Sequence, residues 1–198
     1  MHYQRNLPHL MPPGATLSIT FRLAGSLPQL LIDQLQAEYA KPANMPEDPD
    51  QTYARQRRYF GAFDHLLDTS DRGPMWLQET AIAEVVAETV HFRAGVAYNL
   101  WSCCLMSNYV HLLVSLADTD SKPFFRTLQS LKARTARRCN ELLGRSNIAF
   151  WQPESYDHCV RDDLEMNRIV AYILNNPVKA GLVEDWTQWP HTYLNPDW

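Results

Sequence analysis

The sequence predicts an α+β fold, a ferredoxin-like βαββαβ arrangement with a central antiparallel sheet and a helical insertion. Residues 16–23 alternate apolar and polar side chains, which is typical of a half-buried strand. Residues 96–105 and 109–116 are apolar, rich in aromatic and branched side chains, and joined by a short turn, as in a β-hairpin. Segments with apolar residues at helical spacing lie before and after this hairpin. The resulting order of strands and helices is close to the ferredoxin-like plan.

Local signals place the helices of the first half of the chain. A helix is predicted over 28–39, because it opens with a proline, which favours the first helical turn. Residues 41–52 are rich in Pro, Asp and Glu and are expected to form an exposed loop. Helices are then predicted over 53–67 and 78–92, with a Gly-Pro turn at 71–74 between them.

The second half of the chain continues the same plan. A long helix is predicted over 123–143, and it is expected to end there because a glycine follows directly. Residues 152–161 are expected to form a loop or a short strand. Asp162 caps the last helix, which is expected to reach Asn176 and to stop at Pro177, since proline disfavours helical geometry in the residue before it.

Length, charge and cysteine content limit the class of protein. The chain of 198 residues is expected to form one domain, 1–198, with an inserted helical region over 41–93 and an extended C-terminal tail over 177–198. The formal net charge of -4 excludes a uniformly basic nucleic-acid binder, so such binding must use local patches. The four cysteines form no C-x-x-C pair, which argues against a zinc cluster or a disulfide framework. No signal peptide or membrane span is predicted, and a cytoplasmic location is expected.

Tyr109 and His111 are two residues apart on a predicted strand, so they point to the same face of the sheet. A His-x-His pair in this position would hold a divalent metal by two imidazoles. A neutral phenol is a poor ligand, because its ionisation near neutral pH opposes a pKa of about 10. The alternative is that His111 is an ordinary histidine on a half-buried sheet.

Tyr172 and Asn176 are four residues apart on the predicted last helix and would share one of its faces. The amide oxygen of Asn176 suits a hard metal ion, and the phenol of Tyr172 is a nucleophile able to attack phosphorus. The alternative is a buried tyrosine followed by an Asn-Pro pair that ends the helix.

The predicted helix around 122–145 is strongly basic and carries a single acid, Glu141. Its cations are Lys122, Arg126, Lys132, Arg134, Arg137, Arg138 and Arg145. A basic face in an acidic protein is typical of contact with a phosphate backbone, and the alternative is a solvated helix face. For the smaller cluster of Arg55, Arg57 and Arg58 the solvated interpretation is favoured.

Aromatic residues precede the last helix. Trp151 and Tyr156 are candidates for stacking on unpaired bases, although a tryptophan more often anchors a core. His158, which follows them, is a candidate for a missing metal ligand.

Several segments, in order along the chain, resemble one known family. They are Leu7-Pro8-His9, Pro13-Gly14-Ala15-Thr16, Thr20-Phe21-Arg22-Leu23-Ala24-Gly25-Ser26-Leu27-Pro28, Gly73-Pro74-x-Trp76-Leu77, Asn108-x-Val110-His111-Leu112-Leu113-Val114, Phe150-Trp151-Gln152 and Tyr172-Ile173-x-Asn175-Asn176-Pro177-Val178-Lys179-Ala180-Gly181-Leu182. With these segments, nearly the whole chain resembles the REP-associated tyrosine transposases, which are members of the HUH single-tyrosine transposase superfamily.

The resemblance implies a role for each residue that matches the family motifs. Tyr172 matches the catalytic tyrosine, which attacks a phosphodiester and keeps the 5′-phosphate as a phosphotyrosine. His111 matches the second histidine of the HUH motif, and Asn176 matches the third ligand of a Mg²⁺ or Mn²⁺ ion. The implied substrate is single-stranded DNA folded into the hairpins of repetitive extragenic palindromes. A monomer or homodimer that acts in DNA transposition at the nucleoid is expected, with no membrane partner.

Tyr109 departs from the family pattern, because the motif has its first histidine there. Metal affinity falls ~10–100-fold even on outer-shell changes, so the loss of a ligand matters. Three outcomes are open. Tyr109 binds the metal weakly and cleavage survives at high metal concentration, or His158 or a nearby acid takes the place of the missing histidine. In the third outcome, cleavage is lost and DNA binding is kept. The sequence therefore supports a metal-dependent strand transferase, with a catalytically impaired hairpin-binding protein as the alternative. A generic RNA-binding ferredoxin-like protein is a third hypothesis.

Overall fold

The computed structural model describes residues 14–40, 48–70, 72–116 and 124–198. The contacts divide the chain into two compact units. The first unit contains the described residues up to Ala24 together with Met75–Trp198, and the second is Gly25–Pro74. No helix in the described ranges is both long enough and apolar enough to cross a membrane.

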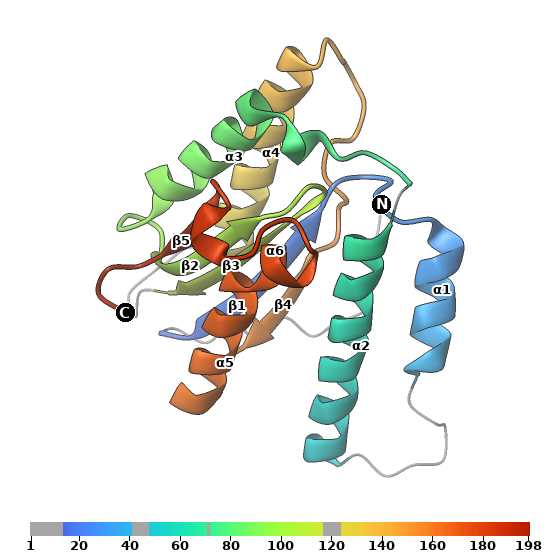
Figure 1. Ribbon diagram of the computed structural model, residues 1–198, viewed down its shortest axis with the longest axis vertical. Coiled ribbons are helices and arrows are strands. Elements are labelled where there is room, and N and C mark those ends of the chain that lie inside the picture. The colour runs from blue at the N-terminus through green and yellow to red at the C-terminus, as the bar shows by residue number, and fades with distance from the viewer. Residues whose placement is uncertain (1–13, 41–47, 71, 117–123) are drawn as a thin grey trace. The chain divides into compact units, whose positions relative to one another are not determined.

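The first unit is built on a five-stranded antiparallel sheet with the strand order β4-β1-β3-β2-β5 (Figure 1). The strands are β1 Thr16–Arg22, β2 Asn99–Leu105, β3 Tyr109–Ser115, β4 Tyr156–Cys159 and β5 Thr192–Leu194. The order of the first four strands is that of the ferredoxin-like plan, and β5 extends the sheet at the β2 edge. The predicted fold class is confirmed, and the 152–161 segment contains a short strand.

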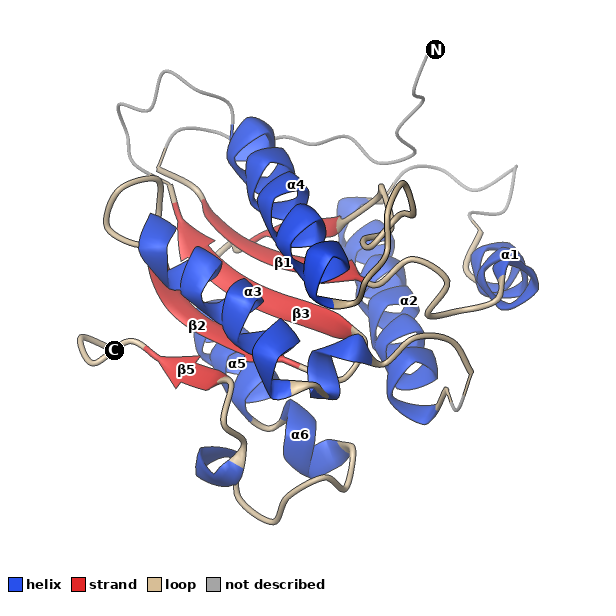
Figure 2. Cartoon of the chain, turned by 90° about the horizontal axis from the view of Figure 1, so that it is seen from above, coloured by secondary structure: helices blue, strands red, loops and turns tan. Residues whose placement is uncertain are grey.

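Helices cover both faces of this sheet (Figure 2). The helices α3 Thr80–Arg93 and α4 Phe124–Leu142 lie on one face, and α5 Asp163–Leu174 lies on the other. The alternation predicted for β1 gives the sheet one apolar and one polar face. Leu17, Ile19 and Phe21 point into the core under α3 and α4. The polar residues of the same strand therefore point toward α5.

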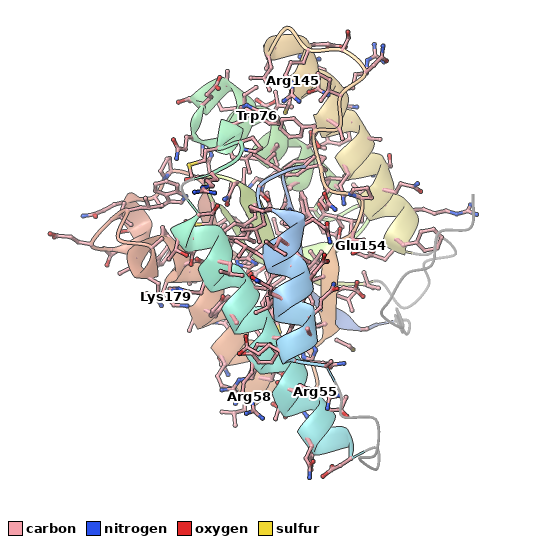
Figure 3. All side chains as sticks on the ribbon, turned by 90° about the vertical axis from the view of Figure 1, so that its right-hand side faces the viewer. Arg55, Arg58, Trp76, Arg145, Glu154 and Lys179 are labelled. Carbon is pink, nitrogen blue, oxygen red and sulfur yellow. The ribbon has the colours of Figure 1, made fainter. Side chains whose placement is uncertain are left out.

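The second unit is a pair of helices, α1 Gln29–Glu38 and α2 Pro49–Thr69. The helix α2 begins before the predicted residue 53, because Asp48 Oδ1 accepts the N–H of Asp50 and a proline occupies the first turn. Residues 49–52 are therefore helical rather than part of the predicted loop, and 41–47 lie outside the described residues. Arg55 and Arg58 project from α2 (Figure 3).

The boundaries of the inserted region differ from the predicted 41–93. The compact second unit is Gly25–Pro74, so it also contains α1. The helix α3 belongs to the first unit, because its buried residues Ile82, Val86 and Val90 pack into the sheet core. Apolar periodicity identifies a helix but not the surface that buries its stripe, which explains why the compact unit has other limits than the predicted insertion. The single-domain organisation of 1–198 stays a prediction.

The sequence predicted an extended C-terminal tail over 177–198, but the structure shows short helical segments within it. The last long helix ends at Leu174, and a short helix α6, Asn176–Lys179, follows it. Pro177 lies in the first turn of α6, where its missing N–H is tolerated. Farther on, Trp186–Gln188 forms a 3-10 turn, and β5 then pairs with β2.

Candidate active site

The strand β3 presents two different sets of side chains. Val110 and Leu112 belong to the core under α3 and α4. Tyr109 and His111 therefore point to the opposite face, where α5 lies, as the strand alternation predicts. Both are buried, with exposed fractions of 0% for Tyr109 and 1% for His111.

The imidazole of His111 is oriented by the neighbouring strand. Thr20 lies opposite His111 in the β1–β3 pairing, and Thr20 Oγ1 is 2.6 Å from His111 Nδ1. In the tautomer in which Nδ1 donates to Thr20, Nε2 keeps a lone pair. This tautomer is the one that either a metal ligand or a proton acceptor requires.

The helix α5 brings Tyr172 to the same place. The ring centroids of Tyr172 and His111 are 5.7 Å apart, and those of His111 and Tyr109 are 4.9 Å apart. The Tyr172 side chain is half-buried, so it lies at the edge of the buried cluster. Lys179 on α6 places its Nζ 4.5 Å from the centre of the Tyr172 ring. The predicted nucleophile therefore has an imidazole and a cation as neighbours.

Asn176 completes the cluster from the start of α6. The hydroxyl of Tyr109 donates a hydrogen bond of 2.8 Å to Asn176 Oδ1, and Asn176 has an exposed fraction of 0%. Its Nδ2 is buried and has no hydrogen-bond partner among the residues that the structure describes. A break in the helix separates Tyr172 from Asn176, so they do not share one continuous helix as the sequence predicted.

The donor set of this cluster does not fit a strong site for Mg²⁺ or Mn²⁺. These ions prefer oxygen ligands and charged carboxylates. Here the amide oxygen of Asn176 already accepts a proton from Tyr109, and Tyr109 is a neutral phenol. His, Cys, Asp and Glu side chains form no group of three placed to hold a metal ion within the described ranges. A metal requirement stays a prediction from the resemblance.

His158 lies elsewhere and does not replace the missing histidine. His158 is on β4 and His111 is on β3, and β1 lies between these two strands. The two histidines are therefore separated by two strand spacings, or about 10 Å. His158 Nε2 is 3.1 Å from Oε1 of Glu165, whose Oε2 also accepts from Arg161. Burial, and then the charge of Arg161, lower the pKa of His158, so its contact with Glu165 at pH 7 is a hydrogen bond from a neutral imidazole rather than an ion pair.

The predicted basic face is on α4, and Figure 2 shows α4 on the opposite face of the sheet from α5, the helix that contains Tyr172. Its exposed cations are Arg126, Arg134, Arg137 and Arg138. Arg137 and Arg138 both lie near Glu141, at 3.0 and 3.9 Å, in exposed ion pairs that contribute little to stability. Arg145 instead stacks its guanidinium on Trp76, 3.8 Å from the ring centre (Figure 3). Lys122 lies outside the described residues.

Lys132 has a structural environment that its charge alone did not predict. Its Nζ donates to the carbonyl oxygens of Gln152 and Pro153, at 2.7 and 3.0 Å, and to Ser155 Oγ at 3.0 Å. The three donors of the ammonium group are thus directed at the segment that leads into β4. Lys132 therefore holds this segment against α4.

We expect Lys132→Met to lower the free energy of unfolding by about 1–3 kcal/mol, because two carbonyls lose a charged donor. Thermal and urea unfolding measure this change. Arg134→Met on the same helix, where the side chain is exposed, is the matched control and should leave stability within about 0.5 kcal/mol. Equal stability of the two variants would contradict the structural role of Lys132.

Trp151 lies in the core rather than on a surface that bases can reach. Its exposed fraction is 5%, its Nε1 donates to Thr135 Oγ1 at 2.8 Å, and its ring packs edge-on against Phe21 at 4.8 Å. The structure thus favours the alternative that the sequence left open, an anchoring tryptophan. Tyr156 is half-buried on β4.

Two members of the cluster have no assigned role in the sequence prediction. Thr20 was visible as part of the polar face of its strand, but only the pairing of β1 with β3 places it beside His111. Lys179 stands in a matched segment, seven residues after Tyr172, and only the turn into α6 brings its ammonium group over the ring. Both depend on contacts between segments that local patterns do not define.

Comparison with known proteins supports the likeness suggested by the motifs. A provisionally named REP-associated tyrosine transposase from Haemophilus influenzae is 28% identical over 102 residues, which cover 48% of this chain and 57% of that protein. The REP-associated tyrosine transposase of Escherichia coli K12 is 28% identical over 99 residues, which cover 50% of this chain and 54% of that protein. This chain resembles the REP-associated tyrosine transposases. No protein-family model matches it.

A solved structure extends the likeness to REP-associated tyrosine transposases from sequence to fold. That structure shows a REP-associated tyrosine transposase bound to a REP hairpin. It matches with a TM-score of 0.53 and 16% sequence identity, and the match covers 97% of this chain and 81% of that one. The aligned segments span little more than half the length of the two curated relatives. The fold is thus shared with a REP-associated tyrosine transposase.

Proposed function

We propose that this protein binds single-stranded DNA folded into hairpins of the REP type and cuts and rejoins it through Tyr172, as a transposase does. The observation that supports this function best is the meeting of Tyr172, His111 and Asn176 in one cluster between β3 and the α5–α6 turn. His111 is more than 60 positions before Tyr172 and Asn176 in the sequence, yet the resemblance predicted roles for all three residues together.

The proposed reaction is a transesterification at phosphorus. Tyr172 Oη attacks the phosphodiester, the P–Oη bond forms, and the P–O3′ bond breaks. The 5′-phosphate stays on the tyrosine, and the departing 3′-oxygen takes up a proton. His111, whose ring neighbours that of Tyr172, is the proposed acceptor of the phenolic proton. Attack by a 3′-hydroxyl on the phosphotyrosine reverses the step and rejoins a strand.

The basic residues of α4 are proposed to bind DNA outside the reacting strand. The exposed residues Arg134, Arg137 and Arg138 lie on the helix that covers the opposite face of the sheet from Tyr172. Contacts to phosphates there would position the hairpin without touching the bond that is cut. Charge reversal at these three arginines should weaken hairpin binding and reduce its salt dependence. Unchanged binding would remove this surface from the proposal.

A covalent-adduct assay tests the proposed function. The protein is mixed with end-labelled single-stranded hairpin DNA and Mn²⁺, and the products are separated on a denaturing gel. A protease-sensitive adduct that carries a 3′-end label is the expected result, because the fragment on the 3′ side of the cut keeps the 5′-phosphate that is bonded to the tyrosine. An RNA hairpin of equal sequence should give none. Preferential binding of the RNA would instead support a generic RNA-binding protein.

Hairpin binding without cleavage is the second candidate function, and the Tyr109–Asn176 hydrogen bond is the observation that favours it. Asn176 Oδ1, the oxygen expected to bind the metal, already accepts this hydrogen bond. The donor, Tyr109, stands where the family motif has its first histidine. A protein in this state would hold hairpin DNA tightly and in a salt-dependent manner, and it would yield no cleaved product.

The variant Tyr109→His distinguishes the two candidate functions. A second imidazole on the same face of β3 would restore a His-x-His pair, and we expect it to raise Mn²⁺ affinity at least about 10-fold. Isothermal titration measures the affinity, and the adduct assay measures cleavage. Adducts from both proteins indicate a working enzyme. An adduct from Tyr109→His alone indicates that the natural chain binds DNA without cutting it.

A further inference from the structure

We propose that this site holds a phosphate group of the DNA directly, through Asn176 Nδ2 and Lys179 Nζ, without a divalent ion between them. The inference rests on the proposed DNA substrate and adds the way in which its phosphate is recognised. It differs from the expectation of the resemblance, in which Asn176 is an oxygen ligand for a metal ion.

Tyr109 determines which atom Asn176 offers. A buried neutral phenol donates its single proton, and here it donates to Asn176 Oδ1 at 2.8 Å. The amide is thereby oriented with its NH₂ group on the other side. A histidine in the place of Tyr109 would leave Oδ1 available to a cation. A tyrosine at position 109, where the family motif has a histidine, thus makes Asn176 a hydrogen-bond donor rather than a cation ligand.

The donor that results is buried and has no acceptor within the described ranges. Asn176 has an exposed fraction of 0%, and the accessible area of its Nδ2 is close to zero. Buried polar groups in folded proteins are nearly always hydrogen-bonded, and exceptions gather at functional sites. An anionic oxygen is the acceptor that such a donor binds most strongly.

Lys179 supplies the positive charge that a phosphate requires. It lies three residues after Asn176, which places both side chains on one face of α6. Its Nζ is 4.5 Å from the centre of the Tyr172 ring, and the residue is exposed. The ammonium group is therefore beside the nucleophile and accessible to an incoming strand.

The neighbouring acid does not oppose this charge pattern. Glu165, the buried carboxylate on α5, lies two helical turns before Tyr172 and is engaged with Arg161 and His158. Lys179 and His111 lie beside the Tyr172 ring, and the amide donor of Asn176 is bonded to Tyr109, the neighbour of His111. Such a set is typical of an anion site.

The experiment compares phosphate recognition with and without metal. Hairpin DNA binding is measured by fluorescence anisotropy in EDTA and in Mn²⁺, with Tyr172→Phe in every protein so that no covalent product forms. Inorganic phosphate binding is measured separately by the shift in melting temperature. The variants are Lys179→Met, Lys179→Arg and Asn176→Asp, and the control is Arg168→Met, which removes an exposed cation on α5.

A direct phosphate site predicts equal DNA affinity in EDTA and in Mn²⁺. Lys179→Met should weaken binding about tenfold, since it removes a charged donor, whereas Lys179→Arg should keep most of the affinity. Asn176→Asp is the sharpest variant, because a carboxylate repels phosphate but improves a metal site. Weaker DNA binding by Asn176→Asp supports the inference, and stronger Mn²⁺-dependent binding overturns it.

The two probes separate this inference from the proposed function. Phosphate stabilisation that requires Lys179, without any hairpin binding, would support the phosphate site and contradict the DNA substrate. Hairpin binding that is lost in EDTA, without phosphate stabilisation, would support the proposed function and overturn the direct contact. Melting temperatures of the variants without ligand confirm that each one is folded.

Discussion

Replacing Tyr172 by phenylalanine is expected to abolish the covalent DNA adduct completely while leaving hairpin affinity within about twofold. The change removes one oxygen atom, which is the proposed nucleophile, and keeps the ring that packs beside His111 and under Lys179. No other residue of the cluster stands where the resemblance places the attacking group. The denaturing-gel assay measures the adduct, and fluorescence anisotropy measures binding.

The control for this experiment is a tyrosine outside the cluster. Tyr193→Phe on β5 removes a hydroxyl from a half-buried ring that packs against His91, and it should leave the adduct unchanged. An adduct that survives in Tyr172→Phe would show that another residue is the nucleophile. Loss of the adduct in both variants would indicate damage to the fold rather than to the chemistry.

Trp151→Ala is expected to lower the free energy of unfolding by about 3–5 kcal/mol, which is the range for truncating a buried aromatic side chain. Trp151 is 5% exposed, contacts Phe21 and Phe150 with ring centroids 4.8 Å away, and donates to Thr135 Oγ1. Its loss would open a cavity between β1 and α4 and remove the buried hydrogen bond. Urea unfolding followed by circular dichroism measures the effect.

A base-stacking residue would behave differently. Truncating a stacking platform weakens binding of unpaired DNA by about 1–3 kcal/mol per base and leaves stability nearly unchanged. Trp198→Ala, at an exposed tryptophan with 42% of its surface accessible, is the matched control and should change stability little. A stable Trp151→Ala protein with weak DNA binding would restore the interpretation of Trp151 as a DNA contact.

Much of the fold was predictable because periodicity is a local property. The alternation in β1 identified both the core-facing Leu17, Ile19 and Phe21 and the polar face that carries Thr20. The same period of two placed Tyr109 and His111 on one face of β3. The limits of the compact unit Gly25–Pro74 and the path of the tail were not predictable in this way, because they depend on which surface buries α3 and which strand pairs with β5.

By itself the sequence determined the sheet plan, the nucleophile candidate Tyr172, and the departure at position 109 from the pattern that it resembles. Tertiary structure decided what that departure does. The bond from Tyr109 to Asn176 joins residues 67 positions apart, so no local pattern encodes it. Tertiary packing also placed Trp151 in the core, used Lys132 as a structural donor and brought Lys179 over Tyr172. Composition indicates the charge of a side chain, but only the packed chain determines which partner that charge meets.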